Sequence, residues 1–91
     1  MYTVSDTVRS THNQDGAIVL DVRQGQMFNL NFVGSRILEL LKSGYTESGI
    51  VDEIGREFGV SQDLAENDVR KFLQALKKSH LVEEHEPDVA A

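Results

Sequence analysis

Three histidines are the side chains in this sequence best suited to catalysis or to metal binding. His12 lies in a predicted turn, His80 at a predicted helix end and His85 close to the C-terminus. Nucleophilic catalysis requires a Ser, Thr or Cys beside a histidine that a carboxylate orients, and we find no such set. His80 and His85 are five residues apart, which is not the i, i+4 spacing that puts two metal ligands on one helix face. The sequence therefore predicts no enzyme, no metal and no cofactor.

The glycines and carboxylates give no sign of a phosphate site or an acid–base pair. The glycines at positions 44, 49, 55 and 59 lie within or at the ends of predicted helices rather than in a phosphate-binding loop. The segment GREFG lacks the lysine of such a loop. The 15 carboxylates fall mainly on predicted solvent faces. Binding without chemistry is the remaining class of function.

Length and composition predict one small globular domain. The chain has 91 residues, 40% of them hydrophobic and 26% charged, and it has no cysteine for disulfides or thiolate metal sites. No apolar run approaches the ~20 residues that cross a bilayer, and MYTVSDTVRS lacks the regions of a secretory signal. We therefore expect a cytoplasmic protein without a membrane partner.

Alternating segments in the first third of the chain predict strands. Residues 2–10 have the pattern of an edge strand, and residues 11–16 (THNQDG) have turn chemistry. Residues 17–22 (AIVLDV) and 26–30 (QMFNL) predict a β-hairpin whose loop contains Gly25.

The last of these strands has two unlike faces. Phe28 and Leu30 share one face, and Met27 and Asn29 share the other. We expect Phe28 and Leu30 to cover the helices, which are too short to be stable alone. Met27 and Asn29 then point away from the core.

Capping residues divide the rest of the chain into three predicted helices. Asn31 is suited to cap a helix over residues 32–43 that stops at Gly44. Thr46 caps the second helix, which ends at Gly59.

The third helix begins after Ser61 or Asp63, since either residue is suited to cap it. Its apolar stripe consists of Val69, Phe72, Leu73 and Leu76. Leu81 and Val82 are expected to fold back on the core.

The order of elements predicts an α+β fold that is winged-helix-like, a three-stranded antiparallel sheet followed by a three-helix bundle. We expect residues 1–84 to form this single domain. Residues 85–91 have no apolar period and contain the only proline, which predicts a disordered tail.

Two kinds of partner suit such a domain. Winged helices often bind DNA through the third helix, and RKFLQALKK (70–78) supplies a basic cluster. Against DNA stand the net charge of −6 and the acidic start of that helix, DLAEND.

The alternative partner is an extended peptide that pairs with a free strand edge. QMFNL is a candidate edge, because it contains neither proline nor lysine to block pairing. The residues alone leave both partners open.

A resemblance to a known family favours the peptide. From Asp15 to Val82 the sequence resembles the PqqD family, named for pyrroloquinoline quinone biosynthesis, whose fold also recognises precursors of other ribosomally made peptides, including lasso peptides. The matching segments, in order, are DGAIVLDVRQGQMFNLN, GSRILELL, YTESGIVDEIGREFGV and DVRKFLQALKKSHLV. One departure is His80, where the family commonly has glycine, so either the helix end differs or His80 adopts an unusual conformation.

The resemblance implies a function in peptide capture. Members of the family bind the leader segment of a precursor peptide as an added strand and hold it for a modifying enzyme, such as a radical SAM enzyme or a leader protease and cyclase. Here Gln26, Met27, Phe28 and Asn29 would form the pairing edge. The partners implied are the leader peptide and that enzyme, not nucleic acid, with the protein a monomer or a weak homodimer.

The third helix would form the wall of the binding groove. Its stripe centres on Val69 and Leu76. One flank carries Leu73, Arg70 and Lys77, and the other carries Phe72, Ala75 and Leu64. We expect the first flank to line the groove, since Leu73 would bury an apolar leader side chain while Arg70 and Lys77 meet carboxylates.

Overall fold

The computed structural model describes residues 2–84, so the tail predicted for residues 85–91 lies outside the described residues. The elements follow one another as β1 (Tyr2–Val4), β2 (Val8–Asn13), β3 (Gly16–Asp21), β4 (Gln26–Asn31), α1 (Phe32–Lys42), α2 (Glu47–Phe58), α3 (Gln62–Lys78) and β5 (Val82–Glu84). The predicted α+β, winged-helix-like fold is confirmed: a three-stranded antiparallel sheet precedes three helices.

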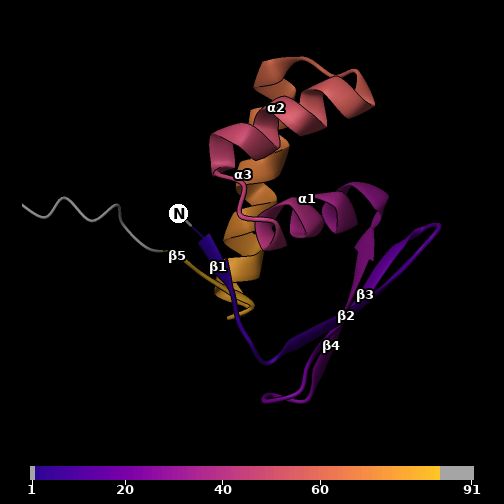
Figure 1. Cartoon of the computed structure of the whole chain (residues 1–91), viewed down its shortest axis with the longest axis vertical. Helices are drawn as coiled ribbons and strands as arrows, with labels where there is room; N and C mark the ends of the chain where they lie inside the picture. Colours follow the sequence, from indigo (N-terminus) through magenta and orange to yellow (C-terminus); the bar gives the residue numbers. More distant parts are fainter. Residues whose placement is uncertain (1, 85–91) are drawn as a thin grey trace, which may run out of the picture.

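The larger sheet has the strand order β2-β3-β4 and lies below α1 in Figure 1. Strands β2 and β3 join through a tight turn, in which the Asn13 side chain accepts hydrogen bonds from the backbone N–H groups of Asp15 (2.8 Å) and Gly16 (2.9 Å). Gly16 has φ 153°, and a Cβ there would collide with the carbonyl oxygen of Leu30. The turn therefore depends on glycine at this position.

Two local sequence predictions are wrong. Residues 2–10 are not one strand, because the chain bends after Val4, and residues 11–16 are not all turn, because β2 continues to Asn13. The short β1 pairs instead with β5 in a second antiparallel sheet, where Val4 lies opposite Val82. Figure 1 shows this sheet beside the lower end of α3. Leu81 and Val82 do fold back into the core, as predicted.

Side-chain caps start all three helices by accepting hydrogen bonds from backbone N–H groups that have no partner inside the helix. Asn31 accepts from Gly34 (2.8 Å), Thr46 from Gly49 (3.1 Å) and Ser61 from Leu64 (3.3 Å). Asn31 and Thr46 confirm the predicted caps, and Ser61 rather than Asp63 caps α3.

The core lies between the sheet and the helices. Val19 of the sheet, Ile37 of α1, Ile50 of α2, Val69 of α3 and Leu81 are each at most 2% exposed and belong to one cluster. The alternation of burial along β3 and the helical periodicity of α1–α3 thus bury one face of each element.

The ends of α1 and α3 share one geometry. In α1 the N–H of Tyr45 donates to the Leu40 carbonyl and that of Gly44 to the Leu41 carbonyl. In α3 the N–H of Leu81 donates to the Leu76 carbonyl and that of His80 to the Lys77 carbonyl. This double-bonded helix end requires a left-handed residue. Gly44 supplies it in α1 with φ 89°, and a histidine supplies it in α3.

That histidine is His80, at φ 62° the one non-glycine residue with positive φ among residues 2–84. A left-handed L-residue costs roughly 1–2 kcal/mol, so we predict that His80→Gly raises the free energy of unfolding by about 0.5–1 kcal/mol. The matched variant Gly44→Ala should lower it by about 1 kcal/mol, because space around Gly44 is open and only its conformation matters. Urea unfolding of both variants measures this; a destabilised His80→Gly would show that the side chain of His80 stabilises the fold.

Candidate functional site

Strand β4 is an edge strand, with β3 as its only neighbour in the sheet that residues 2–84 form. The N–H of Val22 bonds to the carbonyl of Thr7 (3.1 Å) just beyond the last β2–β3 pair. Antiparallel ladders alternate between bonded and non-bonded pairs. The register then shows that the backbone N–H and C=O groups of Gln26, Phe28 and Leu30 point toward β3. Those of Met27 and Asn29 point toward the open edge.

The two faces of β4 are as predicted. Phe28 and Leu30 are half-buried and pack against the core cluster, whereas Met27 and Asn29 are exposed. An edge with free backbone groups and no blocking lysine or proline is able to accept another strand.

A groove of about 430 Å³ opens where β4 runs into α1. Its floor and walls come from the end of β4, the first half of α1 and the middle of α3, namely Asn31, Val33, Gly34, Ile37, Asp68, Lys71 and Phe72. Apolar carbons of Val33, Ile37 and Phe72 lie beside two charged side chains. The groove thus suits a peptide side chain that is largely apolar.

The close approach of Gly34 in α1 to Phe72 in α3 shapes this groove. A Cβ at Gly34 would lie 2.9 Å from the Phe72 ring, so the absence of a side chain at residue 34 admits the ring. Asn31 both ends β4 and caps α1. The edge and the groove therefore share one rigid connection.

The predicted wall residues do not gather beside β4. Val69, Leu73 and Leu76 are buried in the core, at most 3% exposed, so none of them offers surface to a ligand. Arg70 bonds to Glu66 (2.7 Å) and lines a cavity with residues of α2, and Lys77 bonds to Glu84 of β5 (2.8 Å).

The other flank of α3 faces the groove instead. Phe72 is half-buried there, and Asp68 and Lys71 have no ion-pair partner within residues 2–84. The apolar stripe predicted which residues face the core but could not distinguish the two flanks, because both border it equally. Gly34 is the residue that could have indicated the correct flank of α3, because its lack of a side chain makes room for Phe72 against α1.

A buried carboxylate, that of Asp21, stabilises the turn between β3 and β4. Asp21, 1% exposed, accepts hydrogen bonds from the Thr7 hydroxyl (3.0 Å), the Arg23 N–H (3.0 Å) and the Gln24 side chain (2.6 Å). Burial alone would raise the pKa of Asp21, but these bonds stabilise its charged form more strongly and lower that pKa.

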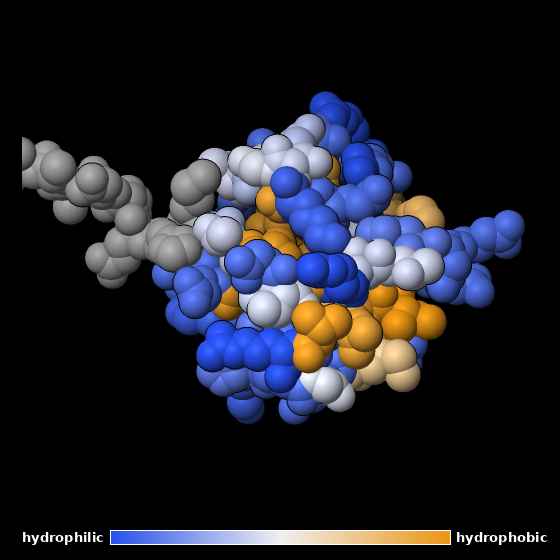
Figure 2. Space-filling view, turned by 60° about the horizontal axis from the view of Figure 1, so that its bottom comes forward, coloured by the Kyte–Doolittle hydropathy of each residue, from blue (hydrophilic) through white to orange (hydrophobic). Residues whose placement is uncertain are grey.

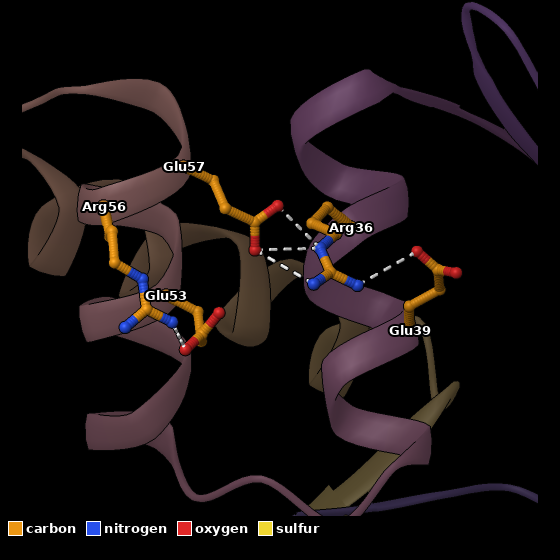
Figure 3. Close-up of polar contacts among 5 residues, drawn as sticks. All are labelled: Arg36, Glu39, Glu53, Arg56 and Glu57. Atoms are coloured by element: carbon orange, nitrogen blue, oxygen red, sulfur yellow. Dashed lines mark hydrogen bonds and ion pairs between the residues drawn. The ribbon is translucent and has the colours of Figure 1, made fainter.

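An ion pair fixes α1 against α2. Arg36 donates two parallel hydrogen bonds to Glu57, both 2.9 Å, and also contacts Glu39 (Figure 3). The hydrogen bond from Arg36 is the main reason that the pKa of Glu57 is lowered. A neighbouring pair, Arg56 and Glu53, lies along α2.

Within residues 2–84, we find no group of three side chains placed to hold a metal ion. The same part of the chain contains no helix that is both long enough and apolar enough to cross a bilayer.

Fold and site together define a small winged-helix-like domain with a free strand edge beside a groove. The family model described as coenzyme PQQ synthesis protein D (PqqD) matches residues 16–82, and the chain therefore belongs to the PqqD family. No curated protein gives a significant match.

Solved structures extend the comparison. TbiB1 in complex with the TbiA(beta) leader peptide is 39% identical, with TM-score 0.85 over 93% of this chain and 99% of that one. Lasso peptide synthetase B1 complexed with the leader peptide is 20% identical, with TM-score 0.82 over 91% and 98%. The PqqD truncation of Methylobacterium extorquens PqqCD, a stand-alone recognition element for ribosomally made, modified peptides, is 19% identical, with TM-score 0.75 over 91% and 88%. At these identities, the last two show a common fold.

The lowered pKa of Asp21 predicts an acid-sensitive turn. Its bonds stabilise the fold fully above the pKa of Asp21 in the unfolded chain, about 3.9, and this stabilisation is lost as the pH falls through the lower pKa of the folded state. Asp21→Asn should therefore reduce stability at neutral pH and flatten the loss of stability below about pH 5.

Denaturant unfolding between neutral and acidic pH measures this effect. Asp52→Asn removes the same charge at an exposed position of α2 and is the matched control for the change of charge. A slope unchanged in Asp21→Asn would contradict the assignment of the acid sensitivity to Asp21.

Proposed function

We propose that this protein is a non-catalytic adaptor, which binds the leader segment of a ribosomally made precursor peptide and presents it to a modifying enzyme. The observation that carries the proposal is the open edge at Met27 and Asn29 beside an apolar groove. A relative 39% identical over nearly its whole length, TbiB1, binds a leader peptide.

The leader peptide adds to the sheet as a fourth strand. Its backbone exchanges hydrogen bonds with Met27 and Asn29, and its inward side chains cover Phe28, Leu30 and Phe72, which the protein alone leaves half-exposed. Apolar burial, about 25 cal/mol per Å², supplies most of the affinity. Lys71 at the groove rim adds at most about 1 kcal/mol through a peptide carboxylate.

The wall of this site is the Phe72 flank of α3 rather than the flank with Arg70 and Lys77. Phe72 lines the groove at the end of β4, whereas Arg70 and Lys77 are turned toward α2 and β5.

The partner enzyme receives the bound precursor for chemistry that this chain does not perform. A radical SAM enzyme, or a leader protease with its cyclase, fits the family and the leader complexes of similar proteins. Because precursor peptides of this kind leave the ribosome in the cytoplasm, we place the adaptor there too. It acts as a monomer or a weak homodimer.

Binding of DNA by α3 has no support in the structure or the comparisons. Two of the four basic residues between positions 70 and 78, Arg70 and Lys77, are paired with Glu66 and Glu84, and the first turn of α3 carries Asp63. Phosphate binding would weaken steeply with salt, whereas strand addition with apolar burial should change little.

We predict that Asn29→Pro weakens leader binding at least about tenfold, since proline removes an edge N–H and obstructs the incoming strand. The fold should survive, because proline is tolerated on a strand edge whose N–H faces solvent. The TbiA(beta) leader peptide, labelled for fluorescence anisotropy, is the probe.

The matched variant Asn29→Ala keeps the backbone N–H and should bind almost as tightly as the unaltered protein. Equal affinities of Asn29→Pro and Asn29→Ala would show that the peptide does not pair with this edge.

A further inference from the structure

The outer face of the larger sheet carries three large apolar side chains and one charged side chain. Ile18, Leu20 and Met27 are 41%, 38% and 67% exposed on strands whose opposite face covers the core. Of the outward side chains of β2, β3 and β4, only Arg9 is charged, in a chain of net charge −6. Figure 2, which brings the lower end of the molecule forward, shows apolar residues in more than one area, one of them toward the lower right, among hydrophilic ones.

These side chains form rows across the strands. Arg9 pairs with Leu20 and Leu20 with Met27, whereas Thr11 pairs with Ile18 and Ile18 with Asn29. Each row ends at the open edge of β4, the first with a thioether and the second with an amide. The end members of the two rows therefore differ in polarity.

An added strand continues both rows by one residue. Its side chains alternate between the faces, and those on the outer face lie about 5 Å from their neighbours in β4. Because Met27 and Asn29 also supply the free backbone groups, pairing fixes which peptide positions lie beside them. One outward peptide residue thus contacts Met27, and another, two positions along, contacts Asn29.

We propose that Met27 is a specificity-determining residue, which selects leader segments with an apolar residue on the outward side of the added strand. This inference rests on the proposed function. Beside Met27, the inward face of the same strand meets Phe28, so the preferred leader is apolar on both faces at the Met27 end. At the Asn29 row the outward residue is polar. Methionine suits this role because its flexible, polarizable side chain packs against apolar groups of different shapes.

The test is a scan of the TbiA(beta) leader peptide, in which each position is replaced in turn by Leu, Glu or Lys. Anisotropy with the unaltered protein should reveal one position, outside the inward apolar set, where Leu binds up to about fivefold more tightly than Glu or Lys. With Met27→Glu the order at that position should reverse, so that Lys binds best.

Ile18→Glu is the matched control. Ile18 lies on the same face but on β3, with Asn29 between it and the added strand. This variant places the same charge on the sheet without contacting the peptide neighbour of Met27, and it should leave the order of Leu, Glu and Lys unchanged.

The outcomes separate this inference from the function on which it depends. If the peptide binds, Asn29→Pro weakens it, and Met27→Glu leaves the scan unaltered at every position, the selective role of Met27 is wrong and the adaptor function stands. If both glutamate variants alter the scan equally, the effect is general electrostatics, and the inference also fails. A peptide that does not bind to β4 overturns both.

Discussion

The structure depends on one constraint: β4 is paired on one side only within residues 2–84. Phe28 and Leu30 on its inner face pack against the core, and this packing fixes the orientation of the strand and of its free edge. Met27 and Asn29 therefore keep unpaired backbone groups at a fixed position. Since Asn31 ends the strand and caps α1, that edge also keeps a fixed distance from the groove at Phe72.

The remaining structure holds this edge in place. The Asp21 network fixes the turn before β4, and the Arg36–Glu57 pair fixes α1 on α2. Within residues 2–84, every buried side-chain nitrogen and oxygen has a hydrogen-bond partner. The hydrogen-bonded interior holds the open strand and its half-buried apolar neighbours in place before a peptide arrives. Such preorganisation lowers the entropic cost of binding.

Sequence reasoning predicted the features that local physics determines. Asn31 and Thr46 identified helix starts, and alternation along QMFNL identified its two faces, because caps and periodicity act within a few residues. Pairing of β1 with β5 was missed, since it joins opposite ends of the described chain that carry no local signal for each other. The flank of α3 was also not determined by its stripe: burial of Leu73 follows from periodicity, but the direction of Phe72 depends on Gly34 of another helix.

An amide NMR titration with the TbiA(beta) leader peptide shows directly whether a peptide strand adds to the edge of β4. The largest shifts should fall on Met27 and Asn29 and, in α3, on Asp68, Lys71 and Phe72, with β2 and β5 little affected. Shifts confined to Lys77 and β5, or a β4 unchanged by saturating peptide, would contradict strand addition at this edge.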